Sequence, residues 1–280
     1  MTVNEIYQSG LKLLENNNIE NSKFEAQSLL QKAFSLDRVG FITHKTDKAD
    51  ENCSHNFLKF IEKRISGEPL QYILGEWSFM GFDFKVGRGV LIPRDDTEVV
   101  VNLCIDFLKN RTDKKTVDLC SGSGAIAVAL DKISGAEVTA VEIDETAFSY
   151  LETNVKENNS SVKPVMADAL KICDTFADGK LDLIVSNPPY IKSAEIETLQ
   201  KEVRLEPRLA LDGGEDGYDF YREIVSRWSR KLKKGGALAF ELGENQADAV
   251  KALMTDKGFS DFKISLDFGG VQRAIIGTLL

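Results

Sequence analysis

The 280-residue sequence contains only two histidines, His44 and His55, and four cysteines. Two histidines cannot supply a histidine-rich metal site, so we expect no bound metal. The cysteines are far apart and form no Cys-x-x-Cys pair, which is typical of reduced thiols in cytoplasm. They are Cys53, Cys104, Cys120 and Cys173.

Long apolar runs and a secretory leader are also missing. No apolar stretch approaches the length of a membrane span. The first residues contain neither a basic region nor an apolar core, so we expect no signal peptide, no membrane contact and a cytoplasmic protein. The net charge of −9 argues against a broad surface that binds nucleic-acid phosphates, and we expect no direct nucleic-acid binding.

What is present indicates two folded parts joined by a connector. Residues 1–74 carry apolar side chains at helical spacing and no strand signal, which predicts a small helical domain. This domain is either a stabilising appendage or a docking module for a macromolecular substrate, and periodicity fits both. Alternating Phe82, Phe84 and Val86 between glycines predict a β-hairpin linker over residues 75–92.

Residues 93–280 alternate strand and helix patterns, which predicts an α/β domain with a mostly parallel sheet covered on both faces. The last two strands are expected to form an antiparallel hairpin that turns near Gly269-Gly270. The expected strands are 116–120, 138–143, 162–166, 181–186, 237–242, 262–267 and 274–279, and the main helices are 125–130, 145–157, 218–232 and 247–257.

The turn Asn187-Pro188-Pro189-Tyr190 follows the apolar strand 181–186. Two prolines end the strand, and they hold Asn187 in an extended conformation at its carboxyl end, where α/β sheets bind ligands. A planar nitrogen that bears hydrogens can donate to the Asn187 side-chain oxygen and the Pro188 carbonyl while Tyr190 packs on its flat face. The alternative is a strand terminator without chemistry. We expect the four residues to bind the substrate, with Asn187, Pro188 and Tyr190 as the catalytic groups.

A glycine-containing loop joins the first strand of the α/β domain to its helix. It runs from Asp118 through Cys120, Ser121, Gly122 and Ser123 to Gly124. Such a loop lets the backbone approach a ligand at a helix N-terminus, and with Ala127 it also fits the dinucleotide fingerprint. The Asp118 carboxylate would repel a pyrophosphate but attract an ammonium group, which argues against a nicotinamide cofactor.

Two further acids end neighbouring strands. Glu142 stands about twenty residues beyond the glycines, where an acid hydrogen-bonds ribose hydroxyls. Asp168, followed by Ala169, is placed to accept from an adenine amino group. With the glycine loop and Asn187, which borders the same pocket, these acids predict a site for S-adenosylmethionine. Arg94, in a loop beside the crevice, is a weaker candidate for substrate binding.

At these residues the chain resembles the HemK-type release-factor glutamine methyltransferases. Besides the Asn187 turn, the resemblance covers residues 67–72 (GEPLQY), Gly75, 92–94 (IPR) with 97–98 (TE), 206–207 (EP) with 210–211 (AL), and 267–273 (DFGGVQR). It implies a Rossmann-like class I S-adenosylmethionine-dependent domain at 93–280 and a substrate-docking domain at 1–74. It also implies methylation of the glutamine side-chain amide in the Gly-Gly-Gln motif of class-1 peptide chain release factors by a monomeric enzyme.

Some positions depart from that family's pattern. Cys120-Ser121 stand where glycine and threonine are frequent, Asp95 replaces a common proline, and Glu142 replaces aspartate. Three alternatives stay open from the residues alone: a methyltransferase that acts on an exocyclic amine of a nucleic-acid base, a nicotinamide-dependent oxidoreductase, and a catalytically silent binding module.

Overall fold

The computed structural model describes Met1–Leu280, and the chain divides into two compact units. The first unit comprises Met1–Glu76 together with Gln200–Leu205. The second comprises Trp77–Leu199 and Glu206–Leu280. A short segment from the second half of the sequence therefore belongs to the N-terminal unit.

The first unit is helical, as the periodicity predicts. Gly10 allows the first and fourth helices to approach each other, because a β-carbon there would lie 2.4 Å from the ring of Phe57. The helices are α1 (Val3–Asn16), α2 (Ser22–Phe34), α3 (Arg38–His44), α4 (Glu51–Ile65) and α5 (Leu70–Leu74). The helix α3 was not predicted, because its seven residues are too few to show a period.

A buried ion pair anchors the returning segment in this unit. The Arg64 guanidinium lies 2.5 Å from the carboxylate of Glu25, and both side chains are about one-tenth exposed. The same guanidinium lies 2.9 Å from Glu202. Arg64 therefore links α2, α4 and the segment Gln200–Leu205.

The second unit is a seven-stranded sheet in the order β5-β4-β3-β6-β7-β9-β8, preceded by the hairpin β1–β2. The strands are β1 (Glu76–Phe79), β2 (Phe82–Lys85), β3 (Lys115–Leu119), β4 (Glu137–Glu142), β5 (Lys163–Met166), β6 (Leu181–Ser186), β7 (Leu232–Glu241), β8 (Phe259–Leu266) and β9 (Gln272–Leu279). The helices are α6 (Thr97–Leu108), α7 (Ala125–Ser134), α8 (Glu145–Glu157), α9 (Asp219–Trp228) and α10 (Ala247–Thr255). Short 3-10 turns η1 (Ile172–Thr175), η2 (Ile196–Thr198), η3 (Val203–Leu205), η4 (Arg208–Ala210) and η5 (Ser229–Lys231) occupy the connections.

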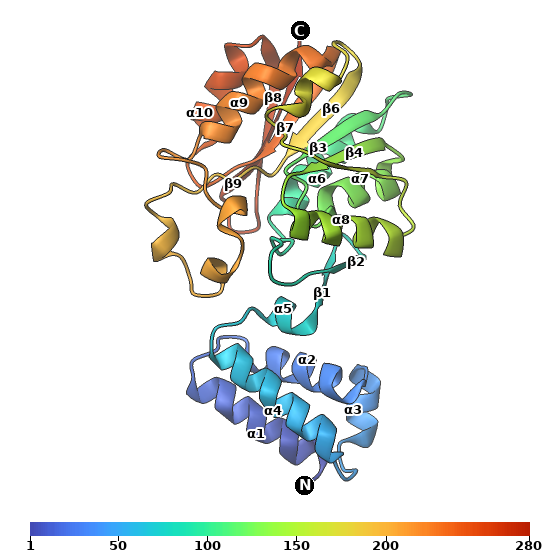
Figure 1. Ribbon diagram of the computed structural model, residues 1–280, viewed down its shortest axis with the longest axis vertical. Helices are drawn as coiled ribbons and strands as arrows, with labels where there is room; N and C mark the ends of the chain where they lie inside the picture. The colour runs from blue at the N-terminus through green and yellow to red at the C-terminus, as the bar shows by residue number, and fades with distance from the viewer. The chain divides into compact units, whose positions relative to one another are not determined.

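Helices cover both faces of the sheet. In Figure 1, α6, α7 and α8 lie on one side of the strands and α9 and α10 lie on the other. Strand side chains alternate between the two cores, so that Val185 faces one and Ile184 the other. The hairpin does more than connect, because Phe79 and Phe84 are buried in the core under α6 and α7.

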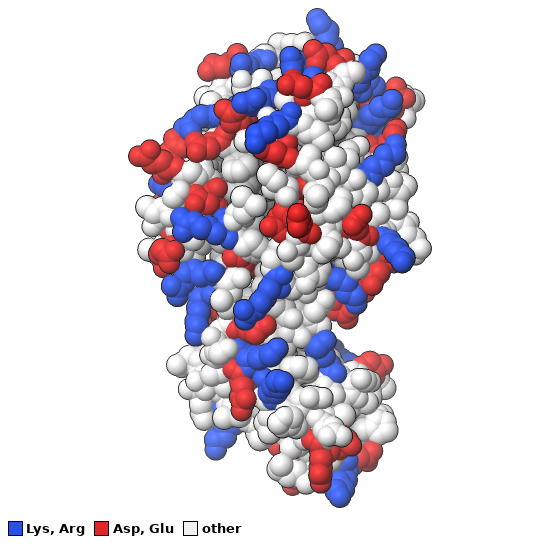
Figure 2. Space-filling view, viewed as in Figure 1, with Lys and Arg blue, Asp and Glu red and all other residues white.

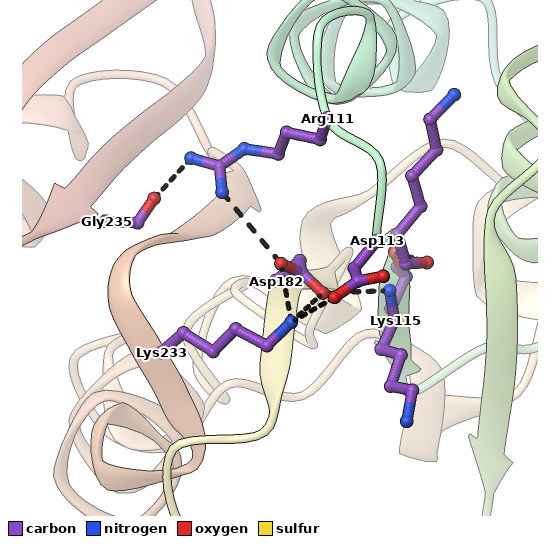
Figure 3. A network of polar contacts seen from close by, with 8 residues as sticks. Arg111, Asp113, Lys115, Asp182, Lys233 and Gly235 are labelled. Atoms are coloured by element: carbon purple, nitrogen blue, oxygen red, sulfur yellow. Dashed lines mark hydrogen bonds and ion pairs between the residues drawn. The ribbon is translucent and has the colours of Figure 1, made fainter.

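The Asp182 carboxylate joins the amino ends of three strands (Figure 3). It accepts from the backbone N–H of Lys115 at 3.1 Å, and it lies 3.0 Å from the ammonium of Lys233 and 3.9 Å from Arg111. This network lies at the amino ends of β3, β6 and β7. The carboxyl ends of the parallel strands, where α/β sheets bind ligands, lie at the opposite edge of the sheet.

The predicted α/β class with its antiparallel last strand is confirmed. The predicted helix 218–232 is wrong at its end: α9 stops at Trp228, and β7 begins at Leu232 rather than at 237. Gly235 and Gly236 lie inside β7, whose pairing with β6 is irregular at this point. A glycine in a strand often marks such an irregularity.

No helix of the structure is long and apolar enough to span a bilayer. On the face seen in Figure 2, lysine and arginine side chains are interspersed with aspartate and glutamate side chains. This face shows no extended patch of one sign.

Candidate active site

The carboxyl ends of β3, β4, β5 and β6 border a cavity of about 240 Å³ within the second unit. The sheet order places these four strands side by side, so residues that are far apart in sequence meet at one edge. The predicted residues that line the cavity are Cys120, Ser121, Gly122, Ser123, Glu142, Asp168, Ala169, Asn187 and Pro189. Asp118, Gly124, Pro188, Tyr190 and Arg94 are not in its lining.

The glycine loop takes left-handed backbone conformations, which explains its composition. Gly122 and Gly124 have φ values of +54° and +83°. A β-carbon at Gly124 would lie 2.4 Å from Leu151 in α8, so α8 packs directly on the start of α7. Cys120 also has a positive φ, +59°, at the position where glycine is frequent in the family that the sequence resembles. A side chain in this region costs about 1–2 kcal/mol, so the cysteine is tolerated but strained.

Glu142 holds this loop to the end of β4. One carboxylate oxygen accepts from the Gly122 N–H at 2.8 Å, and the other accepts from the N–H groups of Ile143 and Asp144 at 2.8 and 2.9 Å. A carboxylate has about four lone-pair positions, so the group retains acceptor capacity. Its position in the cavity wall is compatible with the predicted contact to ribose hydroxyls, which stays a prediction.

Asp168 and Ala169 form the far wall. Burial raises the pKa of Asp168, but hydrogen bonds from Lys171 and from the Leu170 N–H outweigh burial, so the net shift is downward and the carboxylate is charged at neutral pH. The carbonyl of Ala169 accepts from the Trp228 indole at 2.9 Å, which fixes the wall to α9. An ionised acceptor at this position suits the predicted adenine amino group.

Asp118 lies behind the loop rather than on the cavity surface. Its side chain is completely buried, and neither carboxylate oxygen has a hydrogen-bond partner. Burial, and to a smaller extent the nearby charge of Glu142, raises the pKa of Asp118 to about 8. An unpaired buried carboxylate is costly, which makes the position favourable for a cation.

The residues present fit S-adenosylmethionine. The unpartnered carboxyl of Asp118 suits its ammonium, and Gly122 offers open space because a β-carbon there would meet nothing within 4 Å. Glu142 and Asp168 supply acceptors along the same wall.

The Asn187 turn borders the same cavity. The Asn187 side-chain nitrogen donates to the Thr97 hydroxyl at 3.4 Å, which leaves the side-chain oxygen to accept from another group. The backbone approaches Gly213 so closely that a β-carbon there would lie 2.7 Å from the Cα of Tyr190. Pro188 and Pro189 are buried, so the turn is stiff.

Tyr190 is held at both its hydroxyl and its carbonyl. The hydroxyl donates to the Glu241 carboxylate at 3.2 Å, and the carbonyl accepts from the Gln246 side chain at 3.1 Å. Glu241 is the last residue of β7 and is 2 % exposed. Burial raises the pKa of Glu241 to about 7.

Arg94 pairs with the buried carboxylate of Glu206 and does not line the cavity. Glu206 also accepts from the N–H of Ile92 at 3.0 Å. The pair thereby ties the loop before α6 to the start of η4. The predicted contact of Arg94 with a substrate is not supported by this arrangement and stays a prediction.

Thr97 and Glu241 were missed as site residues. Thr97 lines the cavity at the start of α6, but in the sequence it is one threonine among helix-initiating residues. Glu241 had a usable signal: it is a carboxylate at the end of an apolar strand, as Glu142 is. The apolar walls formed by Ile92, Leu209 and Phe220 come from separate connections and have no common sequence pattern.

Family models match both units. The PrmC N-terminal domain model matches residues 5–75, and the methyltransferase small domain model matches residues 94–206. Among solved structures, a methyltransferase from Pyrococcus furiosus is 22 % identical with a TM-score of 0.53 and covers 72 % of this chain and 90 % of its own. The catalytic domain of hMettl16 in complex with MAT2A 3′UTR hairpin 1 is 14 % identical with a TM-score of 0.58 and covers 85 % of both chains. These two likenesses concern the fold alone.

Curated relatives match over nearly the whole chain. The release factor glutamine methyltransferase of Clostridium acetobutylicum is 34 % identical over 99 % of this chain and 98 % of its own length. That of Geobacter sulfurreducens is 40 % identical over 93 % of this chain and 91 % of its own. The aligned region with Clostridium acetobutylicum spans nearly the whole chain and therefore includes the helical unit, the connector and the residues of the cavity. The chain therefore belongs to the family of release factor glutamine methyltransferases.

Proposed function

We propose that this protein transfers a methyl group from S-adenosylmethionine to the side-chain amide nitrogen of the glutamine in the Gly-Gly-Gln motif of a class-1 peptide chain release factor. The observation that carries the proposal is the orientation of Asn187. Its nitrogen is occupied by Thr97, so its oxygen is available as an acceptor on the wall of the cavity that contains the glycine loop.

The chemical problem is a weak nucleophile, because the lone pair of an amide nitrogen is delocalised into its carbonyl. S-adenosylmethionine supplies an electrophilic methyl group when it is bound. The Asn187 side-chain oxygen and the Pro188 carbonyl accept the two N–H groups of the substrate amide, so that its nitrogen faces the cofactor side of the cavity. Both acceptors also stabilise the positive charge that develops on nitrogen.

Tyr190 fixes the plane of the substrate amide through its ring. The hydrogen bond to Glu241 and the buried prolines keep the ring in place. No histidine lines the cavity, and the two carboxylates that line the site, Glu142 and Asp168, accept from protein groups, so we infer that alignment and electrostatics account for the rate. The amide proton leaves late, to water.

The first unit docks the release factor in this proposal. The segment Gln200–Leu205 belongs to that unit and continues directly from the loop after the Asn187 turn. Docking energy from the first unit can therefore contribute to placing the glutamine without any contact at the cavity itself.

The test is methyl transfer from labelled S-adenosylmethionine to a purified bacterial class-1 release factor, with a Gln→Ala variant of its Gly-Gly-Gln motif as the matched control. Label on the wild-type factor alone supports the proposal. Equal label on both factors moves the acceptor to another residue. Absence of label despite tight cofactor binding favours a nucleic-acid base as the acceptor, and single-stranded DNA and RNA are the next substrates to assay.

A further inference from the structure

The carboxyl group of Glu241 is buried next to Tyr190 of the Asn187 turn and does not line the cavity. One oxygen accepts from the Tyr190 hydroxyl at 3.2 Å, and the other has no hydrogen-bond partner. A buried carboxyl group with an unpartnered oxygen lowers the stability of the folded protein. A purely structural role therefore does not explain why Glu241 is present.

Thr97 lies between this carboxyl group and Asn187. Its hydroxyl oxygen accepts from the Asn187 side-chain nitrogen at 3.4 Å, and its hydroxyl group lowers the pKa of Glu241. A threonine hydroxyl has one proton to donate and two lone pairs. Since Asn187 approaches as a donor, the proton of Thr97 points elsewhere. Glu241, whose pKa the Thr97 hydroxyl lowers and one of whose oxygens is unpartnered, is the acceptor available to it.

We propose that Glu241 is a positioning residue, whose carboxylate accepts from the hydroxyls of both Thr97 and Tyr190 and so orients the Asn187 oxygen and the Tyr190 ring toward the glutamine amide. The inference rests on the proposed function and adds Glu241 and Thr97 to the groups on which methyl transfer depends. Glu241 touches neither substrate nor cofactor in this account.

The orientation depends on the charge of Glu241. An ionised carboxylate only accepts, so both hydroxyls donate to it and Thr97 keeps its lone pairs for Asn187. A protonated carboxyl must donate its own proton to one of the two hydroxyls, and that hydroxyl then loses its fixed direction. Transfer therefore requires the ionised form.

The groups around Glu241 determine its pKa. Burial is the largest influence and raises its pKa, the charge of Asp96 at the start of α6 raises it, and the charge of Arg273 on β9 lowers it. Asp96 and Arg273 lie 3.2 Å apart and partly cancel. With the pKa of Glu241 at about 7, the ionised fraction increases about tenfold from pH 6 to pH 8.

The experiment measures kcat for methyl transfer to the release factor from pH 6 to pH 9, at saturating cofactor and substrate, for wild type and Glu241→Gln. We expect the wild-type kcat to increase about tenfold through pH 7 and the kcat of Glu241→Gln to be low and to lack this increase. The dissociation constant for S-adenosylmethionine is expected to stay within about twofold, because Glu241 does not line the cavity.

Thr97 supplies the matched pair. Thr97→Val keeps the shape and removes the hydroxyl, so it should lose the same pH-dependent increase, whereas Thr97→Ser should retain it. A pH profile of Glu241→Gln that parallels that of wild type would overturn the proposal. If Glu241→Gln does not fold, Thr97→Val decides: a wild-type profile in that variant overturns the proposal, and its loss supports it. Failure of wild type to label the release factor would instead refute the proposed function.

Discussion

Each half of the site contains one buried carboxyl group with an unpartnered oxygen, and the surroundings of the two groups differ. In the cofactor half, formed by Asp118, the loop 120–124, Glu142 and Asp168, neither oxygen of Asp118 has a partner. In the acceptor half, formed by Thr97, residues 187–190 and Glu241, one carboxyl oxygen is bound to Tyr190. The first arrangement favours a cationic ligand, and the second orients neighbouring protein groups. We therefore expect cofactor binding and substrate alignment to be separable by mutation.

The largest expected effect comes from removing the acceptor. Asn187→Ala removes the oxygen that holds the substrate amide, and we expect kcat to decrease by about 10²–10³, the range for loss of one preorganised group in a transition state. The affinity for S-adenosylmethionine should change less than about threefold. Single-turnover transfer and calorimetric titration measure the two quantities separately. Equal losses of kcat and of cofactor affinity would contradict the assignment of Asn187 to the acceptor half of the site.

The converse variant is Asp118→Asn. It keeps the shape but removes the charge opposite the cofactor ammonium, and we expect the dissociation constant of S-adenosylmethionine to increase about 10–100-fold while kcat at saturation stays close to wild type. Because the pKa of Asp118 is raised to about 8, binding to wild type should also release a proton near pH 7. Calorimetry in buffers of different ionisation enthalpy detects that proton. An unchanged affinity would show that the ammonium binds elsewhere.

The raised pKa of Asp118 also predicts how the free energy of unfolding depends on pH when no cofactor is bound. The pKa of Asp118 is about 8 in the folded protein and about 4 in an unfolded chain. Folding therefore favours the protonated form, and the contribution of Asp118 to stability decreases as pH increases from about 4 to about 8. We expect Asp118→Asn to gain stability relative to wild type over this range, by up to several kcal/mol. Urea unfolding at pH 5, 6.5 and 8 measures the difference, and a difference that is constant with pH would refute the prediction.

The smallest effect is expected at Cys120. Its φ of +59° costs about 1–2 kcal/mol, and glycine removes this strain but loses about 0.5–1 kcal/mol to greater freedom in the unfolded chain. Cys120→Gly should therefore change stability by about 1 kcal/mol or less. Cys120→Ala keeps the strain and serves as the control. A stability lower than that of the alanine variant would show that the backbone strain is negligible.

Much of this architecture could be predicted from the sequence because local patterns and topology agreed. Strand 181–186 and helix 145–157 were predicted at the bounds found. The end of α9 and the start of β7 could not be predicted, because the first residues of β7 are held by an irregular pairing with β6, a strand that lies far away in sequence.

The candidate residues at the ends of β4, β5 and β6 were predicted, whereas Glu241 at the end of β7 and Thr97 at the start of α6 were missed. Glu142, Asp168 and Asn187 each follow an apolar strand, so the order of the strands brings them together. The Thr97 and Glu241 contacts depend on how α6 and β7 meet the turn, and no local spacing encodes that meeting. The pairing of Arg94 with Glu206 could not be predicted, because the two residues lie more than one hundred positions apart in sequence.

The most direct test of the account is to locate the transferred methyl group by tandem mass spectrometry on a release factor methylated by this protein. We expect a mass increase of one methyl group on the side-chain nitrogen of the Gly-Gly-Gln glutamine, and about 10²–10³ times slower formation of this product when Asn187→Ala replaces wild type under the same conditions. A methyl group on a carboxylate, a lysine or a backbone nitrogen would contradict the account.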